Sequence, residues 1–303
     1  MIPFPAQTSR FSVLGWLLLM GAAWGLEFSM LKLAAEAGFP GTAVLLVTLA
    51  LVAAVLCAIL TLRGGWFLPA GRTFVFLLVI ALLGYVLPLL AALWAAPRVP
   101  AGTMTLIASF TPVVTVATAL LLRTEAVSVR RIVAVGLGLA AALLVLLPEA
   151  SLPSGGSLIW LLVVFVVPLT YGVESVYVAV AWPQGIDPLQ VATGQSLVTL
   201  VLLVPIHLAF GEAMTYDPAW PAGQAAILVV AACVLVEVLL YFLIISRTGG
   251  VLVSFSMYIS LFAGIAWGWA IFGEQLGATV WLATAVLAVG LALTVPPRER
   301  RAP

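Results

Sequence analysis

Three glutamates lie deep inside apolar runs of this 303-residue chain, where a carboxylate is far from bulk water. Glu27 follows "LLLMGAAWGL", Glu174 lies within "LTYGVESVYV", and Glu237 lies within "CVLVEVLLYF". An acidic residue at the centre of an apolar membrane helix costs about 2.5–3.5 kcal/mol on insertion scales. Such residues usually face a cavity or a partner and not lipid. The sequence therefore predicts that these acids surround a shared chamber inside the protein.

Two functional roles remain open for these carboxylates. They can bind the amine or another cationic group of a substrate. Alternatively, burial favours the protonated form of a carboxyl group, so that the acids take up protons in exchange for substrate. A purely structural role, in which a hydrogen-bonded glutamate ties two helices together, is the third interpretation.

Aromatic residues accompany the acids at helical spacing. Trp24 comes three residues before Glu27, and Tyr171 comes three residues before Glu174, so each pair projects from one side of its helix. Tyr241 follows Glu237 by four residues. A pocket lined by aromatic rings suits an amphipathic small molecule, and cation–π contact suits an amine. Ordinary core packing is the alternative for these rings. The predicted substrate-binding residues are Trp24, Glu27, Tyr85, Ser109, Tyr171, Glu174, Glu237, Tyr241 and Tyr258.

Other chemistry finds little support. Cys57, Cys233 and the single histidine, His207, are far apart in apolar segments, so we expect no metal site and no cofactor. No paired nucleophile and base is evident, and no phosphate-binding "G-x-x-x-x-G-K" loop is present. We therefore expect neither an enzyme nor an ATP-driven pump. A channel would need rings of charge or a filter loop, and the sequence offers neither.

The composition requires a membrane. Hydrophobic residues make up 64% of the chain and charged residues only 8%, against roughly 25% charged residues in soluble domains. Apolar runs long enough to cross a bilayer recur throughout. The predicted fold is an all-α integral membrane protein with ten transmembrane helices. Their expected ranges are 11–35, 41–62, 73–96, 100–122, 129–147, 157–181, 188–209, 223–246, 249–272 and 276–296.

The basic residues predict the orientation. With the N-terminus inside, ten arginines fall in cytoplasmic segments, whereas only Lys32 and Arg98 fall on the opposite side. This bias predicts cytoplasmic termini in a bacterial-type inner (plasma) membrane. No basic patch indicates nucleic acid as a partner.

An internal repeat divides the chain into residues 1–150 and 151–303. Glu125 and Glu274 align at a shift of 149 residues, as do Arg98 and Arg247, without a gap. Further upstream, "WGLE" (24–27) matches "YGVE" (171–174) at a shift of 147. Five spans per half is an odd number, so the second half enters the membrane from the opposite side. Inverted repeats of this kind build many secondary transporters.

The repeated segments resemble a known family. "LLLMGAAWGLEFSMLKLA" is similar to the opening helix of EamA-type members of the drug/metabolite transporter superfamily. "IASFTPVVTVATALLLRTEAVSVRRIVAVGLGLAAALLV" and "MYISLFAGIAWGWAIFGEQLGATVWLATAVLAVGLAL" resemble its fourth and fifth helices and their repeat. The resemblance implies a ten-helix exporter of small metabolites, with the YddG-like amino-acid exporters as one branch.

The expected function is secondary transport by alternating access, exporting small metabolites such as amino acids or related amines. The alternative is a proton-coupled multidrug exporter of lipophilic cations. The expected partners are a small-molecule substrate and the lipid bilayer. Proton coupling and the oligomeric state stay open, and a monomer is compatible with the sequence.

Overall fold

A computed structural model describes residues 10–95, 98, 107–124, 128–146, 158–212, 221–273 and 278–294. These ranges contain helices and no strand. The aligned loop residues Glu125 and Glu274, and the predicted boundary between residues 150 and 151, lie outside the described ranges.

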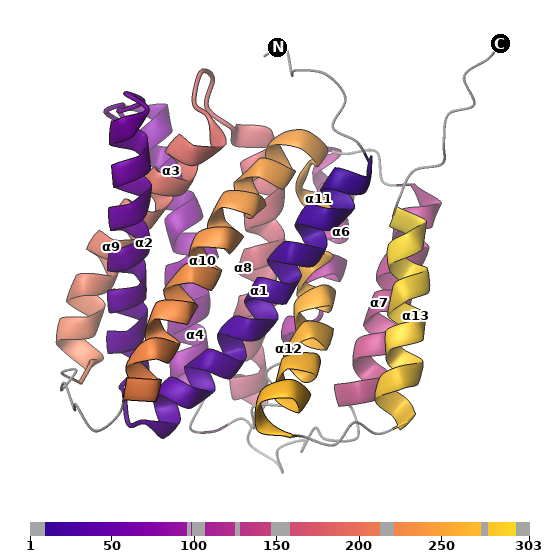
Figure 1. Ribbon diagram of the computed structural model, residues 1–303. Helices are drawn as coiled ribbons and strands as arrows, with labels where there is room; N and C mark the ends of the chain where they lie inside the picture. Colours follow the sequence, from indigo (N-terminus) through magenta and orange to yellow (C-terminus); the bar gives the residue numbers. More distant parts are fainter. Residues whose placement is uncertain are drawn as a thin grey trace.

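The helices run up and down one bundle (Figure 1). Their bounds are α1 (Arg10–Glu36), α2 (Gly41–Leu62), α3 (Arg72–Ala81), η1 (Leu82–Val86), α4 (Leu87–Ala95), α6 (Thr111–Leu122), α7 (Val129–Leu146), α8 (Leu158–Ala181), α9 (Pro188–Phe210), α10 (Pro221–Thr248), α11 (Gly250–Val253), α12 (Ser256–Phe272) and α13 (Ala278–Thr294). Wherever both are described, the predicted boundaries differ from these helix ends by at most two residues. The predicted start of the fourth range, at residue 100, cannot be compared in this way because residues 99–106 lie outside the described ranges.

Seven helices in the described part of the chain are long and apolar enough to cross a membrane. Shorter apolar helices cover Thr111–Leu122 and Trp281–Leu293. Large apolar side chains stand exposed on the outside of the bundle, among them Leu121, Val201 and Leu208. An apolar surface of this extent is stable only against lipid or a partner. The all-helical membrane class is therefore confirmed, whereas the count of ten crossings stays a prediction.

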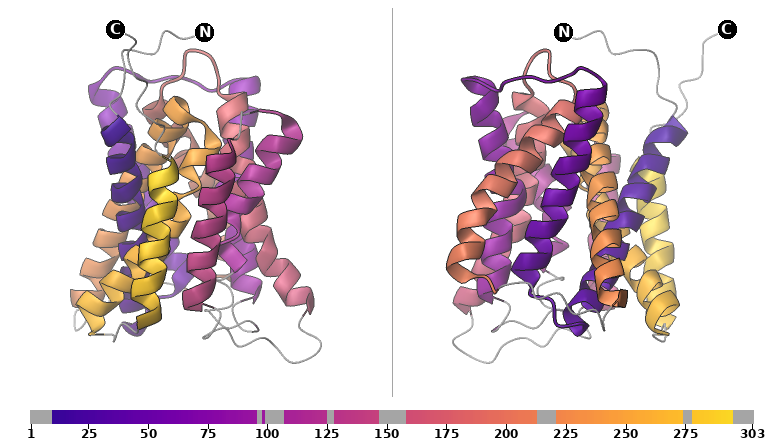
Figure 2. Two further views of the ribbon diagram at one scale, coloured as in Figure 1. Left: turned by 90° about the vertical axis from the view of Figure 1, so that its right-hand side faces the viewer. Right: turned by 60° about the vertical axis from the view of Figure 1, so that its left-hand side comes forward.

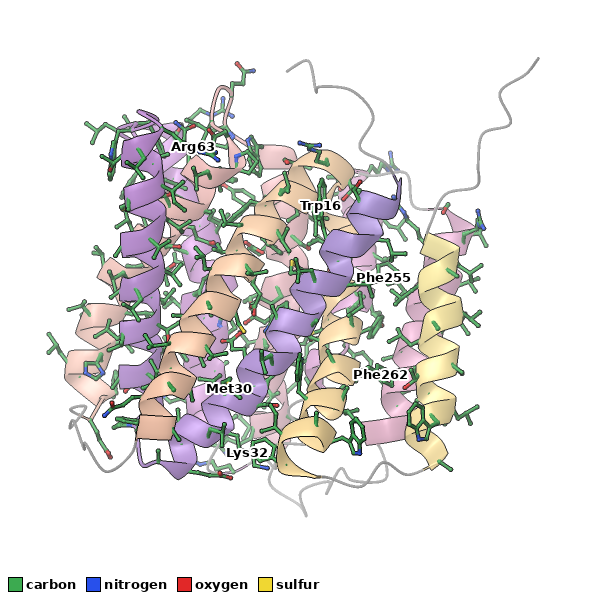
Figure 3. All side chains as sticks on the ribbon, viewed as in Figure 1. Trp16, Met30, Lys32, Arg63, Phe255 and Phe262 are labelled. Atoms are coloured by element: carbon green, nitrogen blue, oxygen red, sulfur yellow. The ribbon has the colours of Figure 1, made fainter. Side chains whose placement is uncertain are left out.

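Basic side chains gather at one end of the bundle. Arg63 follows the end of α2, and Lys32 lies at the opposite end (Figure 3). The helix ends that carry Arg10, Arg72 and Arg247 lie at the same end as Arg63 (Figure 1). We call this the arginine end.

Six helix contacts organise the bundle. Helix α1 packs against α10 and α12, and α8 packs against α4 and α6. Helix α2 packs against α9, and α7 and α13 lie side by side (Figures 1 and 2).

Glycines permit two of the closest crossings. A Cβ atom on Gly25 of α1 would lie 2.5 Å from the backbone nitrogen of Gly264 in α12. A Cβ atom on Gly172 of α8 would lie 2.6 Å from Cγ1 of Val114 in α6. Small residues allow such close approach of membrane helices.

Two spans are interrupted at the level of the central cavity described below. In the third span, the π-helical turn η1 precedes Pro88, and the Leu87 N–H donates to the carbonyl of Leu82 five residues earlier. In the ninth predicted span, Ser254 and Phe255 separate α11 from α12. Single π-helical turns and helix breaks occur frequently at functional sites.

Candidate functional site

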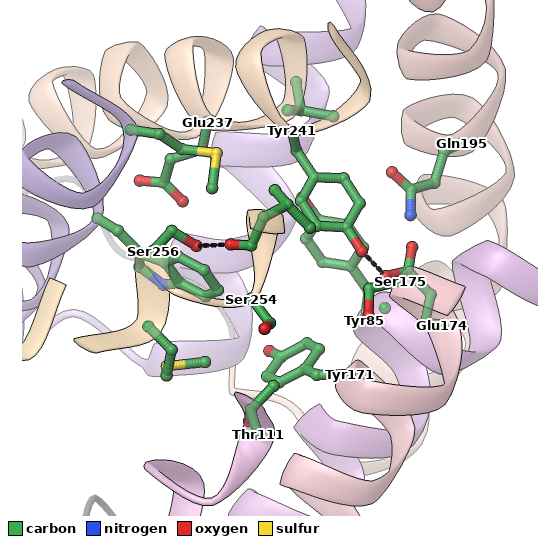
Figure 4. Close-up of a pocket in the computed structure, with 16 residues that line it drawn as sticks. Tyr85, Thr111, Tyr171, Glu174, Ser175, Gln195, Glu237, Tyr241, Ser254 and Ser256 are labelled. Atoms are coloured by element: carbon green, nitrogen blue, oxygen red, sulfur yellow. Dashed lines mark hydrogen bonds between the residues drawn. The ribbon is translucent and has the colours of Figure 1, made fainter. Parts of the chain in front are cut away.

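A cavity of about 100 Å³ lies inside the bundle, between α1, η1, α8, α9, α10 and the α11–α12 break (Figure 4). Among its lining residues are two acids and no basic side chain. The lining residues are Met20, Trp24, Gly84, Tyr85, Thr111, Tyr171, Glu174, Ser175, Gln195, Glu237, Val238, Tyr241, Val253, Ser254, Ser256 and Met257. We call this space the central cavity.

Glu174 is the most buried acid of the cavity. Its side chain is 2% exposed, and its Oε2 accepts a hydrogen bond from the hydroxyl of Tyr241 on α10 (Figure 4). Its Oε1 has no hydrogen-bond partner among the described residues. A buried carboxylate oxygen without a partner carries a desolvation cost that a cationic or hydrogen-bond-donating ligand would remove.

Gln195 of α9 lies beside Glu174. Its Nε2 donates to the carbonyl of Ile80 over 3.0 Å, near the end of α3 and two residues before the π-helical turn. A Cβ atom on Gly84 would lie 3.0 Å from Gln195 Nε2 and 3.3 Å from Glu174 Oε1. The missing side chain at position 84 therefore makes room for both polar groups.

Glu237 faces the cavity from α10, and its Oε1 has no hydrogen-bond partner among the described residues. The carboxyl group of Glu27, on α1, lies within hydrogen-bonding reach of Glu237. Two carboxyl groups this close to each other bind and release protons as a coupled pair. Glu27 itself is not among the lining residues.

Aromatic rings enclose the acids. Trp24 and Tyr171 meet edge to face, with ring centroids 6.2 Å apart. Tyr85 and Tyr241 complete the aromatic lining. Of the nine residues predicted from the sequence, six line the cavity: Trp24, Tyr85, Tyr171, Glu174, Glu237 and Tyr241.

Ser109 and Tyr258 lie outside the lining. The Tyr258 side chain is fully buried, and its hydroxyl donates to the carbonyl of Val135 on α7 over 3.2 Å. Its ring occupies the space that a side chain at Gly138 would need. Tyr258 thus joins α12 to α7. Ser109 is also buried, 3% exposed, just before α6.

Sequence reasoning missed the small polar groups of the cavity: Thr111, Ser175, Gln195, Ser254 and Ser256. The Ser254 hydroxyl donates to the carbonyl of Val251, and that of Ser256 donates to the carbonyl of Val253. Hydroxyl side chains of this kind are common in apolar helices and give no signal by themselves. Gln195 did give a signal in the sequence, because a large amide side chain inside an apolar run needs a hydrogen-bond partner.

No group of three or more metal-binding side chains (His, Cys, Asp, Glu) comes together within the described ranges. The geometry instead suits an organic cation, because two acids and four aromatic rings line one cavity.

Fold and cavity define a multi-pass membrane protein with an acidic internal chamber. The model of the EamA-like transporter family matches residues 11–147. The resemblance predicted from the sequence is confirmed, and residues 11–147 belong to the EamA-like transporter family. The name of the matched family is that of membrane transporters, and the match covers the first half of the helix bundle.

Solved structures agree on the fold. One crystal structure, described only as a protein, superposes with a TM-score of 0.77 over 95% of this chain and 97% of its own, at 18% sequence identity. At that identity the likeness shows the fold alone. No curated protein matches the chain.

Proposed function

We propose that this protein is a secondary transporter that exports small amine-bearing metabolites, such as amino acids, by alternating access. The observation that carries the proposal is the central cavity, in which Glu174 and Glu237 share an aromatic lining that contains no basic side chain. Such a cavity stabilises a cationic group on a small molecule by charge attraction, hydrogen bonding and cation–π contact.

An inverted repeat of two five-helix halves supports alternating access. The matched residues Trp24 and Tyr171 touch each other, as expected for counterparts beside a pseudo-two-fold axis. The glycine crossings are also counterparts, because a shift of 147 takes Gly25 to Gly172 and a shift of 149 takes Thr115 to Gly264. A Cβ on Gly25 would lie 2.5 Å from the nitrogen of Gly264, and one on Gly172 would lie 3.0 Å from the nitrogen of Thr115.

The helix pairings repeat in the same way. In the repeat, α8 is the counterpart of α1, α4 belongs to the counterpart of α10, and α6 is the counterpart of α12. The contacts of α1 with α10 and α12 therefore correspond to the contacts of α8 with α4 and α6. The α2–α9 and α7–α13 pairs each join two counterparts. In transporters of inverted repeats, one half rocks against the other around a site near the membrane midplane. Trp24, Tyr85 and Tyr171 lie near the middle of their spans, as this mechanism requires.

The interrupted helices supply bending points for this motion. The third span bends where η1 meets Pro88, which has no backbone N–H to donate. Pro168 lies inside α8, only three residues before Tyr171. Both positions adjoin the central cavity, so a bend there would change its shape directly.

Cavity size favours small metabolites over drugs. Pockets that enclose drug-sized ligands have volumes of about 300–1,000 Å³, whereas the central cavity has about 100 Å³. A short amine or the amine end of an amino acid fits this space. The multidrug alternative is favoured by the Glu27–Glu237 pair, since two adjoining acids can exchange a proton for a lipophilic cation.

The test is transport by purified protein in proteoliposomes loaded with labelled amino acids, short amines or lipophilic cations. The proposal expects efflux of the first two classes and its loss in Glu174→Gln. The matched control is Glu36→Gln, which changes an exposed acid on α1 and leaves efflux unchanged. Efflux of lipophilic cations alone would favour the multidrug alternative, and wild-type rates in Glu174→Gln would overturn the site.

Proton coupling is tested in the same vesicles with an imposed pH gradient. If the Glu27–Glu237 pair exchanges protons, an inward gradient accelerates wild-type efflux severalfold and leaves Glu237→Gln unaffected. If wild-type efflux ignores the gradient, transport is facilitated diffusion and the pair has a structural role. The proposed orientation places the arginine end in the cytoplasm.

A further inference from the structure

A second, larger cavity lies at the arginine end of the bundle, with a volume of about 530 Å³. Its walls are the connection of residues 182–188, between α8 and α9, and the last turns of α10, including Ser246 and Arg247. We call it the vestibule. We propose that the vestibule is an outer binding site in which Arg247 captures the carboxylate of an amino-acid substrate before the substrate reaches the central cavity.

The vestibule and the central cavity are lined by neighbouring turns of the same two helices. Ser175 and Tyr241 line the central cavity, while Ala179 and Ile245, each four residues further along the same helices, line the vestibule. Four residues correspond to about 6 Å along a helix. Helices α8 and α10 therefore border both spaces, one turn apart.

A layer of aromatic rings separates the two cavities. Phe242 is fully buried and contacts Tyr241 of the central cavity, with ring centroids 5.2 Å apart. Phe242 also contacts Trp182 of the vestibule, with ring centroids 6.1 Å apart. Phe76 packs on the same indole at 6.4 Å. A substrate that moves from one cavity to the other must displace this layer.

Charge defines the ligand class. Arg247 is exposed and is the only basic residue of the vestibule lining. Its guanidinium carbon lies 5.7 Å from the ring centroid of Trp16, and no carboxylate of the described residues pairs with it. A guanidinium group binds carboxylates through two parallel hydrogen bonds, and a Lys ammonium does so less specifically.

The single acid of the vestibule lining is already engaged. The Asp187 carboxylate accepts the backbone N–H of Gln190 at 2.9 Å and caps α9. The Gln190 side chain in turn donates to the Gly65 carbonyl at 2.8 Å, and Trp182 donates to the Ile186 carbonyl at 2.9 Å. These bonds fix the connection and leave Arg247 as the charge available to a ligand.

Together the two cavities offer complementary charges in sequence. Arg247 would hold the carboxylate first, and Glu174 and Glu237 would then hold the amine. This assignment rests on the proposed function, and it adds that the carboxylate decides entry from the arginine end. A simple amine would bypass the first step and bind the central cavity alone.

The test compares valine with isobutylamine, the amine that remains when valine loses its carboxylate. Transport is measured in proteoliposomes from the side on which Arg247 lies. For Arg247→Gln we expect the KM for valine to rise roughly tenfold or more, while the KM for isobutylamine stays within about twofold. Arg247→Lys should recover part of the affinity for valine. Arg63→Gln removes an exposed arginine at the same end and should change neither KM.

The outcomes separate the two proposals. Equal effects of Arg247→Gln on both probes, or no effect on valine, would overturn the role of the vestibule while the proposed function stands. The same KM increase in Arg63→Gln would assign the effect to general surface charge and would also overturn it. If the wild-type protein moves neither probe, the proposed function fails and this inference fails with it.

Discussion

Residues of three different segments surround Glu174, and this makes its environment more specific than that of an isolated buried acid. Tyr241 donates to one carboxylate oxygen from α10, and Gln195 approaches from α9. The turn around Gly84 supplies the space in which the other oxygen lies. A movement of any of these elements would change what Glu174 can bind.

The Tyr241 hydroxyl orients the Glu174 carboxylate, so Tyr241→Phe should weaken substrate binding. A hydrogen bond to a charged group contributes about 1.5–3 kcal/mol, which corresponds to a loss of roughly ten- to hundredfold in kcat/KM. Initial efflux rates over a range of substrate concentrations provide the measurement. Tyr177→Phe is the matched control on α8, because Tyr177 stacks on Phe76 outside both cavities. Equal losses in the two variants would contradict the assignment.

Gly84 provides a sharper probe, since one methyl group decides the outcome. In Gly84→Ala the new Cβ lies 3.0 Å from Gln195 Nε2 and 3.3 Å from Glu174 Oε1, so both polar groups must move by a few tenths of an ångström. We expect a severalfold increase in KM without loss of folded protein. Gly136→Ala on α7 adds the same methyl group where nothing lies within 4 Å, and it should leave KM unchanged. An unchanged KM in Gly84→Ala would mean that Gln195 does not position the acid.

At the scale of the elements, two glycine crossings hold the helices that carry the cavity. Gly25 lets α1 approach α12, and Gly172 lets α8 approach α6. Because the acids Glu27 and Glu174 follow these glycines by two residues in each case, the crossings also set the depth of the acids in the bundle.

Gly25→Val should therefore destabilise the protein. The added side chain would overlap the α12 backbone, and overpacking costs about 1–3 kcal/mol, occasionally more. The measurement is the apparent Tm in detergent, by intrinsic fluorescence. Gly15→Val is the control on the same helix, because position 15 is exposed and has nothing within 4 Å. If both variants keep the wild-type Tm, close contact between α1 and α12 is not required.

The elements could largely be predicted from the sequence, whereas their interruptions could not. Long apolar runs predicted the helix bounds, because a membrane requires such runs to be helical. The π-helical turn at Leu82–Val86 and the break at Ser254–Phe255 depend on neighbouring helices and leave no local pattern. The repeat shift of 149 residues takes Ser109 to Tyr258, yet neither residue lines the cavity, and the Tyr258 hydroxyl donates to the Val135 carbonyl of α7. Helical spacing predicts which residues share a face but not which neighbour that face meets.

At the scale of the whole molecule, the protein combines two cavities with one aromatic layer between them. The central cavity has acids and the vestibule has an exposed arginine. Phe242 and Trp182 fill the intervening space. We therefore expect a path from the arginine end that is open as far as Trp182 and blocked beyond it by these two rings.

Cysteine accessibility tests this arrangement and the membrane orientation together. In a background with Cys57→Ala and Cys233→Ala, single cysteines are placed at Ser246 in the vestibule and at Val238 in the central cavity. A charged thiol reagent added from the arginine end should label Ser246→Cys rapidly and Val238→Cys slowly, since Val238 lies beyond the aromatic layer and is 4% exposed. Glu36→Cys, at the far end of α1, should react only from the opposite side.

In intact cells, labelling of Glu36→Cys but not of Ser246→Cys would support a cytoplasmic arginine end, and the reverse pattern would invert the proposed topology. Equal labelling rates at positions 246 and 238 would mean that Phe242 and Trp182 do not close the path, because a reagent of that size cannot pass a packed aromatic layer.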